Sequence, residues 1–235
     1  MGFRVSIGVV LALSLLSGCL GNGVVEKSSL STAQIDMHCT TPDGISGRPG
    51  TIEEVVALVN ALPKPTSLGC FLDALEKPLK ITATSNQLNG QPAAGARSPR
   101  MFIINLGLIL SVVPDGVGAD RLEMSESAPY AQSTKAEIKF PVLTAISNSF
   151  PYASVLYGAG TTCKSCHANE TALPNDATHS NAYASDKKYP DPTYAVSIAS
   201  ILVSEQNCNP SLEPTRCRIL SAVVGPNRDA YQGSY

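Results

Sequence analysis

The chain has 235 residues, and its 17 basic residues nearly balance its 19 acidic ones, giving a formal net charge of -2 at pH 7. This balance excludes the strongly basic surface by which proteins bind nucleic acids. Charged residues make up only 15% of the chain, whereas Gly and Pro are frequent at 18 and 17 residues, a composition that favours a loop-rich, strand-containing exported protein.

The N-terminal segment is predicted to direct export rather than to belong to the fold. Arg4 precedes an apolar run at residues 5–16, which has the length of a signal-peptide core. The run is too short to span a membrane, because a spanning helix needs about 20 residues. It ends in Leu16-Ser17-Gly18-Cys19, which resembles the lipobox of bacterial lipoproteins. The resemblance implies a signal peptide at residues 1–18 and acylation of Cys19; an ordinary secretory signal is the alternative.

The lipoprotein resemblance also predicts where the protein resides. Acyl chains on Cys19 would anchor it in a lipid bilayer, because each buried methylene contributes about 0.8 kcal/mol. Leu20 rather than Asp follows the acylated residue, which by the sorting habit of this family implies the outer membrane of the bacterial cell envelope, with the protein facing the periplasm. Residues 19–34 are polar and rich in Ser, and they are expected to form a tether.

Residues 35–150 are predicted to form an α+β region that begins with a helical hairpin. Thr51-Ile52-Glu53-Glu54 has the form of a capping box, and apolar residues follow at helical spacing as far as Pro63. A second short helix is expected at about residues 67–77. The apolar side chains of both helices are interpreted as core.

Four or five strands are predicted after this hairpin. Residues 79–85 alternate between apolar and polar side chains, and residues 101–113 are apolar and β-branched, as two strands or one bulged strand would be. Residues 121–127 and 136–142 complete the set, with a turn at Pro114-Asp115-Gly116. A small antiparallel sheet or sandwich is therefore expected ahead of residue 150.

The motif most informative about function is Cys163-Lys164-Ser165-Cys166-His167. Two thiols three positions apart, followed by an imidazole, are what covalent haem attachment needs, because the thiols form thioethers and the histidine ligates the iron. The motif is similar to that of c-type cytochromes. This resemblance implies one haem c, with Cys163 and Cys166 as the attachment residues and His167 as the proximal iron ligand.

The remainder of the last third is expected to surround the motif with helices. Apolar spacing predicts helices at residues 194–203 and 218–224, so residues 151–235 are interpreted as a haem-binding helical region. Phe150, Tyr152 and Tyr157 are the nearest aromatic residues, and either haem walls or ordinary core packing explains them.

The sequence leaves the distal iron ligand open. Small soluble c-type cytochromes supply a Met downstream of the motif, but all four Met of this chain lie upstream of Cys166. His179 is the preferred candidate, and Met101 and Met124 are weaker ones. His38 and an open iron position are further alternatives.

Four cysteines remain once the acylated and haem-binding ones are set aside, and an oxidising compartment favours pairing them. Pairing of sequence neighbours gives Cys39–Cys70 and Cys208–Cys217, one of three possible connectivities. The alternative for the whole set is three structural disulfides and no cofactor.

Three classes of function follow from these features. A membrane-anchored monohaem electron carrier, working with redox partner proteins, is the leading hypothesis, and an enzyme is less favoured. A structural or interaction lipoprotein whose CxxCH forms a disulfide is one alternative, and a haem-based sensor or peroxidase-like enzyme with an open iron site is another. With three His in the chain and no catalytic triad, HExxH or phosphate loop, hydrolytic chemistry is not expected.

Overall fold

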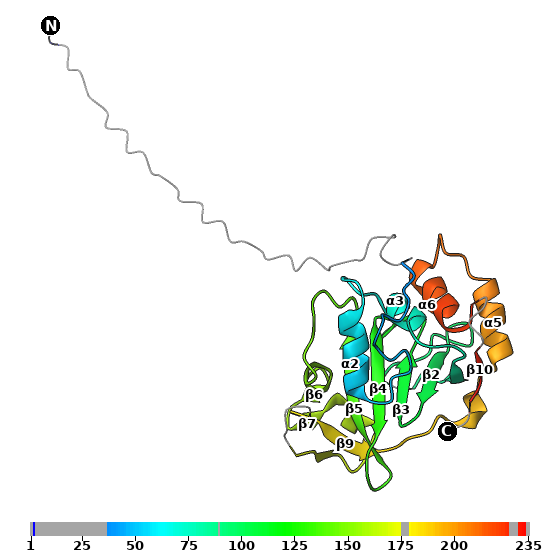
Figure 1. The fold of residues 1–235 in the computed structure, drawn as a ribbon. Helices are drawn as coiled ribbons and strands as arrows, with labels where there is room; N and C mark the ends of the chain where they lie inside the picture. The colour runs from blue at the N-terminus through cyan, green and yellow to red at the C-terminus, as the bar shows by residue number, and fades with distance from the viewer. Residues whose placement is uncertain (1, 3–36, 89, 175–178, 226–229, 234–235) are drawn as a thin grey trace.

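The computed structural model describes residues 2, 37–88, 90–174, 179–225 and 230–233, and these form an α+β fold with a mostly antiparallel sheet (Figure 1). The expected signal peptide (apart from Gly2), the acylation site Cys19 and the tether lie outside these residues. In the described ranges, no helix is both long enough and apolar enough to cross a membrane.

The sheet has eight strands in the order β10-β1-β2-β3-β4-β5-β9-β8, and every neighbouring pair is antiparallel except β1 with β10. The strands predicted between residues 79 and 142 are all present, and residues 101–113 form two of them. The strand bounds are β1 (Lys80–Thr84), β2 (Arg100–Asn105), β3 (Leu108–Val112), β4 (Arg121–Ser127), β5 (Gln132–Lys139), β8 (Thr171–Ala172), β9 (Tyr183–Asp186) and β10 (Tyr231–Gln232).

Thr51 caps helix α2 (Ile52–Ala61) as predicted, although the Glu54 side chain reaches back to Gly50 rather than to Thr51. The Thr51 side chain accepts a hydrogen bond from the Glu54 amide at 3.2 Å, and the Glu54 carboxylate accepts one from the Gly50 amide at 2.6 Å. Ser67 caps the shorter helix α3 (Leu68–Asp73) in the same way. One orphan amide at the start of α2, that of Glu54, is thus satisfied by the cap residue, and the carboxylate of Glu126 in β4 accepts the amide of Ile52 at 2.8 Å.

The core lies between one face of the sheet and the helices. Alternate strand residues such as Leu110, Leu122 and Ile138 are fully buried there, and Val55 and Leu58 of α2 meet them from the helical layer. Full burial of one such side chain stabilises the folded state by about 1.5–3 kcal/mol. The alternation of apolar and polar residues along the strands therefore determines which face of the sheet packs against the helices.

Three more helices complete the fold, namely α4 (Phe150–Ala153), α5 (Ile198–Gln206) and α6 (Pro214–Val224). Helix α6 buries Ile219, Leu220 and Val223 in the core beside α3. The two predicted disulfides are confirmed. Cys39–Cys70 ties the start of the described chain to α3, and Cys208–Cys217 ties the segment after α5 to α6.

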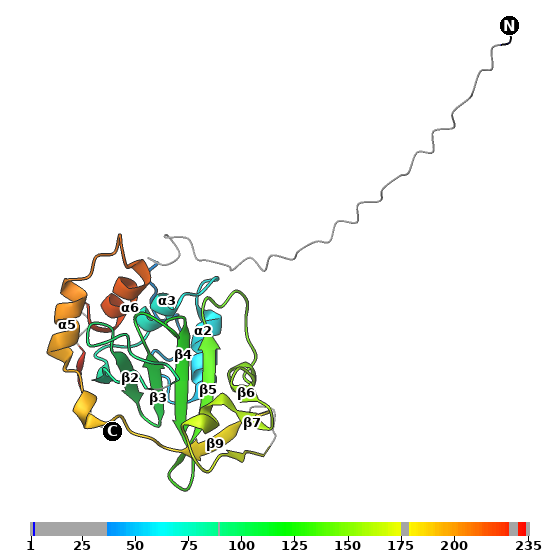
Figure 2. The same ribbon diagram turned by 180° about the vertical axis from the view of Figure 1, so that it is seen from behind.

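The structure differs from the expected helical surround of the CxxCH motif. Residues 151–235 contribute strands β8 and β9, which extend the sheet beyond β5, and a small hairpin of β6 (Leu156–Tyr157) and β7 (Gly160–Thr161). Ala184 and Ser185 are small and both buried, so this segment fits beside β5 as a strand and satisfies its edge. Helices α5 and α6 pack at the opposite side of the fold from β6 and β7 (Figure 2).

Candidate functional site

The CxxCH motif lies on a single 3-10 turn, Thr162–Ser165, that follows β7. Thr161 caps this turn by accepting a hydrogen bond from the Cys163 amide at 3.1 Å. The Cys163 carbonyl oxygen then accepts the amides of Cys166 at 3.0 Å and His167 at 2.9 Å. The turn thus gathers both thiols and the imidazole within one short loop. Neither sulfur forms a disulfide; Cys163 is half-buried and Cys166 is exposed.

The His167 ring is held by the strand that follows it. Its Nδ1 lies 2.9 Å from the backbone carbonyl oxygen of Asp186 in β9. A carbonyl only accepts, so Nδ1 carries the proton and Nε2 keeps the lone pair that a metal ligand needs. Burial, and then the charge of Lys135, lowers the pKa of His167, which favours the neutral imidazole.

The carboxylate of Glu170 binds Thr161, the residue that caps the motif turn. Its Oε1 accepts the Thr161 amide at 3.0 Å, and its other oxygen accepts the Thr161 hydroxyl. A Cβ at Gly160 would collide with Glu170 Oε1, so a larger residue there would have to displace the carboxylate. The sequence analysis missed Glu170, because a lone surface-type carboxylate carries no signal of a contact to a residue nine positions earlier.

A buried lysine lies beneath the motif. Lys135 of β5 is 5% exposed, and burial lowers its pKa to about 8. Its Nζ donates to the hydroxyls of Ser133 at 2.5 Å and Ser125 at 3.2 Å, and those hydroxyls lie 2.8 Å apart. Lys135 lowers the pKa of the Cys163 thiol, although burial, the larger effect, raises it. Sequence reasoning also missed this cluster, whose only signal was a run of polar residues at alternate strand positions.

The surface beside the motif is an open hollow of about 450 Å³. It is lined by Tyr157, Ala159, Gly160, Thr161, Thr162, Lys164 and Ser165. Of the three expected aromatic walls, Tyr157 lines this hollow and is 76% exposed, whereas Phe150 is 41% exposed. Tyr152 is fully buried in the core instead, and its hydroxyl donates to Glu53 at 3.1 Å.

The side chains of the CxxCH motif do not converge as the ligands of one metal ion would. In the described ranges, the ligand atoms of Cys163, Cys166 and His167 are not among those that all lie within 4.8 Å of one another. A tetrahedral zinc site needs such convergence.

The two histidine candidates for the distal iron ligand contact different parts of the fold from His167. His179 lies at the turn before β9, its Nε2 3.8 Å from Glu53 and its ring centroid 6.0 Å from that of Tyr152. The ring of His167, by contrast, meets the last residue of β9. His38 lies beside α3, with Nδ1 2.8 Å from Asp73.

The two methionine candidates are both core residues. Met101 is fully buried and Met124 is 3% exposed. Met124 pairs with Ala136 on the core face, while its neighbour Ser125 pairs with Lys135 on the other face. Both sulfurs therefore lie across the sheet from Lys135, the residue whose charge reaches the motif.

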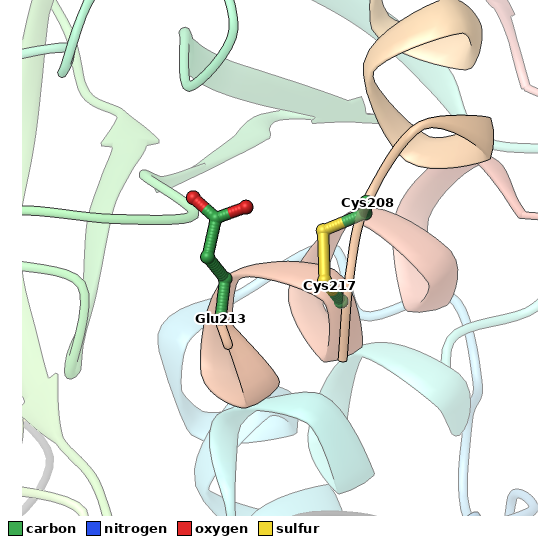
Figure 3. A group of neighbouring side chains, drawn as sticks. All are labelled: Cys208, Glu213 and Cys217. Carbon is green, nitrogen blue, oxygen red and sulfur yellow. A yellow bond between two sulfur atoms is a disulfide. The ribbon is translucent and has the colours of Figure 1, made fainter. Parts of the chain in front are cut away.

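One other group of potential metal ligands occurs in the described part of the chain, comprising Cys208, Glu213 and Cys217 (Figure 3). The two sulfurs are joined as a disulfide and offer no thiolate. Arg216 donates to Glu213 at 3.1 Å and approaches the Cys208 sulfur at 3.1 Å, so a cation already occupies this position.

Comparison of the chain with protein-family models, with curated proteins and with solved structures finds no match. Function must therefore be inferred from the chemistry of the site itself.

Proposed function

We propose that this protein is a lipid-anchored, monohaem c-type cytochrome-like protein of the bacterial cell envelope that transfers electrons to and from redox partner proteins. The observation that carries the proposal is the pair of unbridged thiols next to a histidine whose Nδ1 is fixed by a carbonyl. The other four cysteines of the described chain are already bridged, so Cys163 and Cys166 are the two left for another purpose.

Each residue of the motif has a chemical role in this proposal. The Cys163 and Cys166 thiols add across the two vinyl groups; each sulfur gains a bond to carbon and its proton goes to the neighbouring vinyl carbon, with no leaving group. His167 supplies Nε2 to the iron, and the Asp186 carbonyl keeps the ring oriented. The haem supplies reversible one-electron chemistry at its iron.

The test is expression of the full-length chain in a bacterial host with a working haem c maturation system. We expect covalent haem staining after denaturation and a pyridine haemochrome spectrum. Replacing both Cys163 and Cys166 by Ala should abolish the stain, while replacing Cys208 and Cys217 by Ser should retain it and serves as the matched control. Wild-type protein without haem would refute the proposal.

A thiol–disulfide centre is the second candidate function. The observation favouring it is the exposure of Cys166 on the same turn as Cys163, beside a hollow that stays open to solvent. Oxidation would join the two sulfurs and release two protons, with the two electrons passing to the disulfide of an oxidised partner protein. Peptide mapping that finds a Cys163–Cys166 bridge in haem-free protein would support this candidate over the first.

A further inference from the structure

Lys135 lies close enough to the CxxCH motif for its positive charge to act on the motif. It lies on β5 between Thr134 and Ala136, on the face opposite the core, where it pairs in register with Ser125 of β4. This is the sheet face that α2 leaves uncovered (Figure 2), yet Lys135 is only 5% exposed.

The Lys135 ammonium is surrounded by hydroxyl groups rather than by a counter-ion. Ser133 and Ser125 accept its hydrogen bonds. The hydroxyl of Ser185, which is opposite Ser133 on β9, is buried and has no hydrogen-bond partner among the described residues. Within the described residues, no carboxylate forms an ion pair with Lys135. Neutral oxygen atoms solvate a charge but do not cancel it, so its field extends outward.

The carboxylate of Glu123, the nearest on the same face of β4, has another partner. Its Oε2 lies 2.5 Å from a guanidinium nitrogen of Arg100, which comes from β2. Glu123 and Arg100 influence the pKa of Lys135 in opposite directions, and Lys187 lowers it further. The surroundings of Lys135 therefore leave an excess of positive charge.

Strand pairing brings the motif close to this charge. His167 meets Asp186, which is in register with Gln132 of β5, and the Gln132 side chain donates to the Asn169 carbonyl at 2.9 Å. Lys135 follows Gln132 by three residues, about 10 Å along the strand. Burial raises the pKa of Cys163 and lowers that of His167, and the charge of Lys135 acts on both groups in the lowering direction.

We propose that the buried ammonium of Lys135 sets the reduction potential of the haem attached at Cys163 and Cys166, by favouring the reduced state. This inference depends on the proposed function. Reduction adds one negative charge to the iron, so a nearby cation in a poorly screened interior stabilises the product of reduction. Loss of that cation therefore shifts the potential to more negative values.

The test is a potentiometric titration of the haem-loaded full-length protein at pH 6.5, where Lys135 is protonated. Lys135→Met should move the midpoint potential to a more negative value. Glu123→Gln removes an anion from the same face and should move it to a more positive value. Lys139→Met changes a residue of the same strand whose side chain is 63% exposed and paired with Asp120, and should leave the potential close to that of the wild type.

The opposite signs separate an electrostatic role from a structural one. Loosening of the site by either substitution would expose the haem and shift both potentials the same way, and that result would overturn the inference. An unchanged potential in Lys135→Met, with haem content equal to wild type, would also overturn it while leaving the proposed function intact. Absence of covalent haem from the wild-type protein would overturn both.

Discussion

At the scale of single residues, His167 and His179 make contrasting contacts. His167 has one ring nitrogen fixed by the Asp186 carbonyl, whereas His179 lies against Glu53 and Tyr152. In the proposed function, the first arrangement would orient a metal ligand through a supporting partner. The second is that of a histidine stabilised by a carboxylate and a ring.

The two histidines should therefore respond differently to substitution. We expect His167→Ala to abolish the wild-type ferric haem spectrum even where the thioethers persist, because the iron loses its proximal nitrogen. His179→Ala should leave the optical and electron paramagnetic resonance spectra of the ferric protein unchanged. A low-spin wild-type signal that disappears in His179→Ala would instead identify His179 as the sixth ligand.

Lys135 also predicts a pH dependence of stability. Its pKa falls from 10.5 to about 8 on folding, so the unfolded chain binds more protons between these values. Stability from this residue therefore increases as the pH rises through that window. Relative to the wild type, the free energy of unfolding of Lys135→Met should be highest near pH 7. This difference between variant and wild type should decrease by about 3 kcal/mol by pH 10.5.

Denaturant unfolding at several pH values measures this difference in the free energy of unfolding. Lys139→Met, which removes an exposed side chain from the same strand, is the control for the loss of a lysine from β5. A difference for Lys135→Met that stays constant from pH 7 to 10.5 would show that the Lys135 pKa is not lowered in the folded protein.

At the scale of elements, the motif loop depends on contacts from outside the motif. Glu170 is the only residue whose side chain is seen to accept both the amide and the hydroxyl of Thr161 in the described structure. Thr161 is 4% exposed, so its amide has little access to water as a substitute.

Glu170→Ala should therefore destabilise the turn that carries the cysteines. Leaving a buried amide unsatisfied costs about 1–3 kcal/mol, and we expect faster hydrogen exchange at Thr161 and Cys163. Glu170→Gln keeps one acceptor oxygen and should therefore destabilise the turn less than Glu170→Ala does. Equal exchange rates in Glu170→Ala and wild type would mean that the Glu170 carboxylate contributes nothing to the order of the turn.

Local sequence signals predicted the elements that local interactions form. Thr51 and Glu54 specify the start of α2 through hydrogen bonds within four residues, and alternation specifies the strands up to residue 142. Asp186 and Gln132 are 54 positions apart in the chain, and no local pattern indicates that their strands pair. The helices predicted at residues 194–203 and 218–224 form as α5 and α6, but strands β8 and β9 beside the motif and the contribution of Lys135 were missed for that reason.

At the scale of the whole molecule, the described chain begins at one end of the fold. The carbonyl of Met37 accepts a hydrogen bond from Arg218 of α6, and Cys39 is bridged to α3. The motif lies toward β6 and β7, away from this end in both views (Figures 1 and 2).

Anchoring itself is tested at Cys19. Cys19→Ala should abolish labelling by radioactive palmitate and release the protein from the membrane fraction, because the acyl chains provide the anchor. Cys39→Ala, which removes a different cysteine, should retain the label. Undiminished labelling of Cys19→Ala would show that the lipobox resemblance is misleading.

The pairing of β9 with β5 has a consequence for the order of events during biogenesis. The Asp186 carbonyl reaches His167 only after residues 183–186 have emerged and joined the sheet, and β10 closes the far edge later still. A polypeptide that crosses a membrane unfolded therefore presents its CxxCH segment before the partners of that segment are in place. Long-range pairing of this kind is slow compared with local helix formation, so there is an interval in which both thiols are accessible to a maturation enzyme. Attachment would precede docking of the loop, and the finished sheet would then hold the modified histidine in its final orientation.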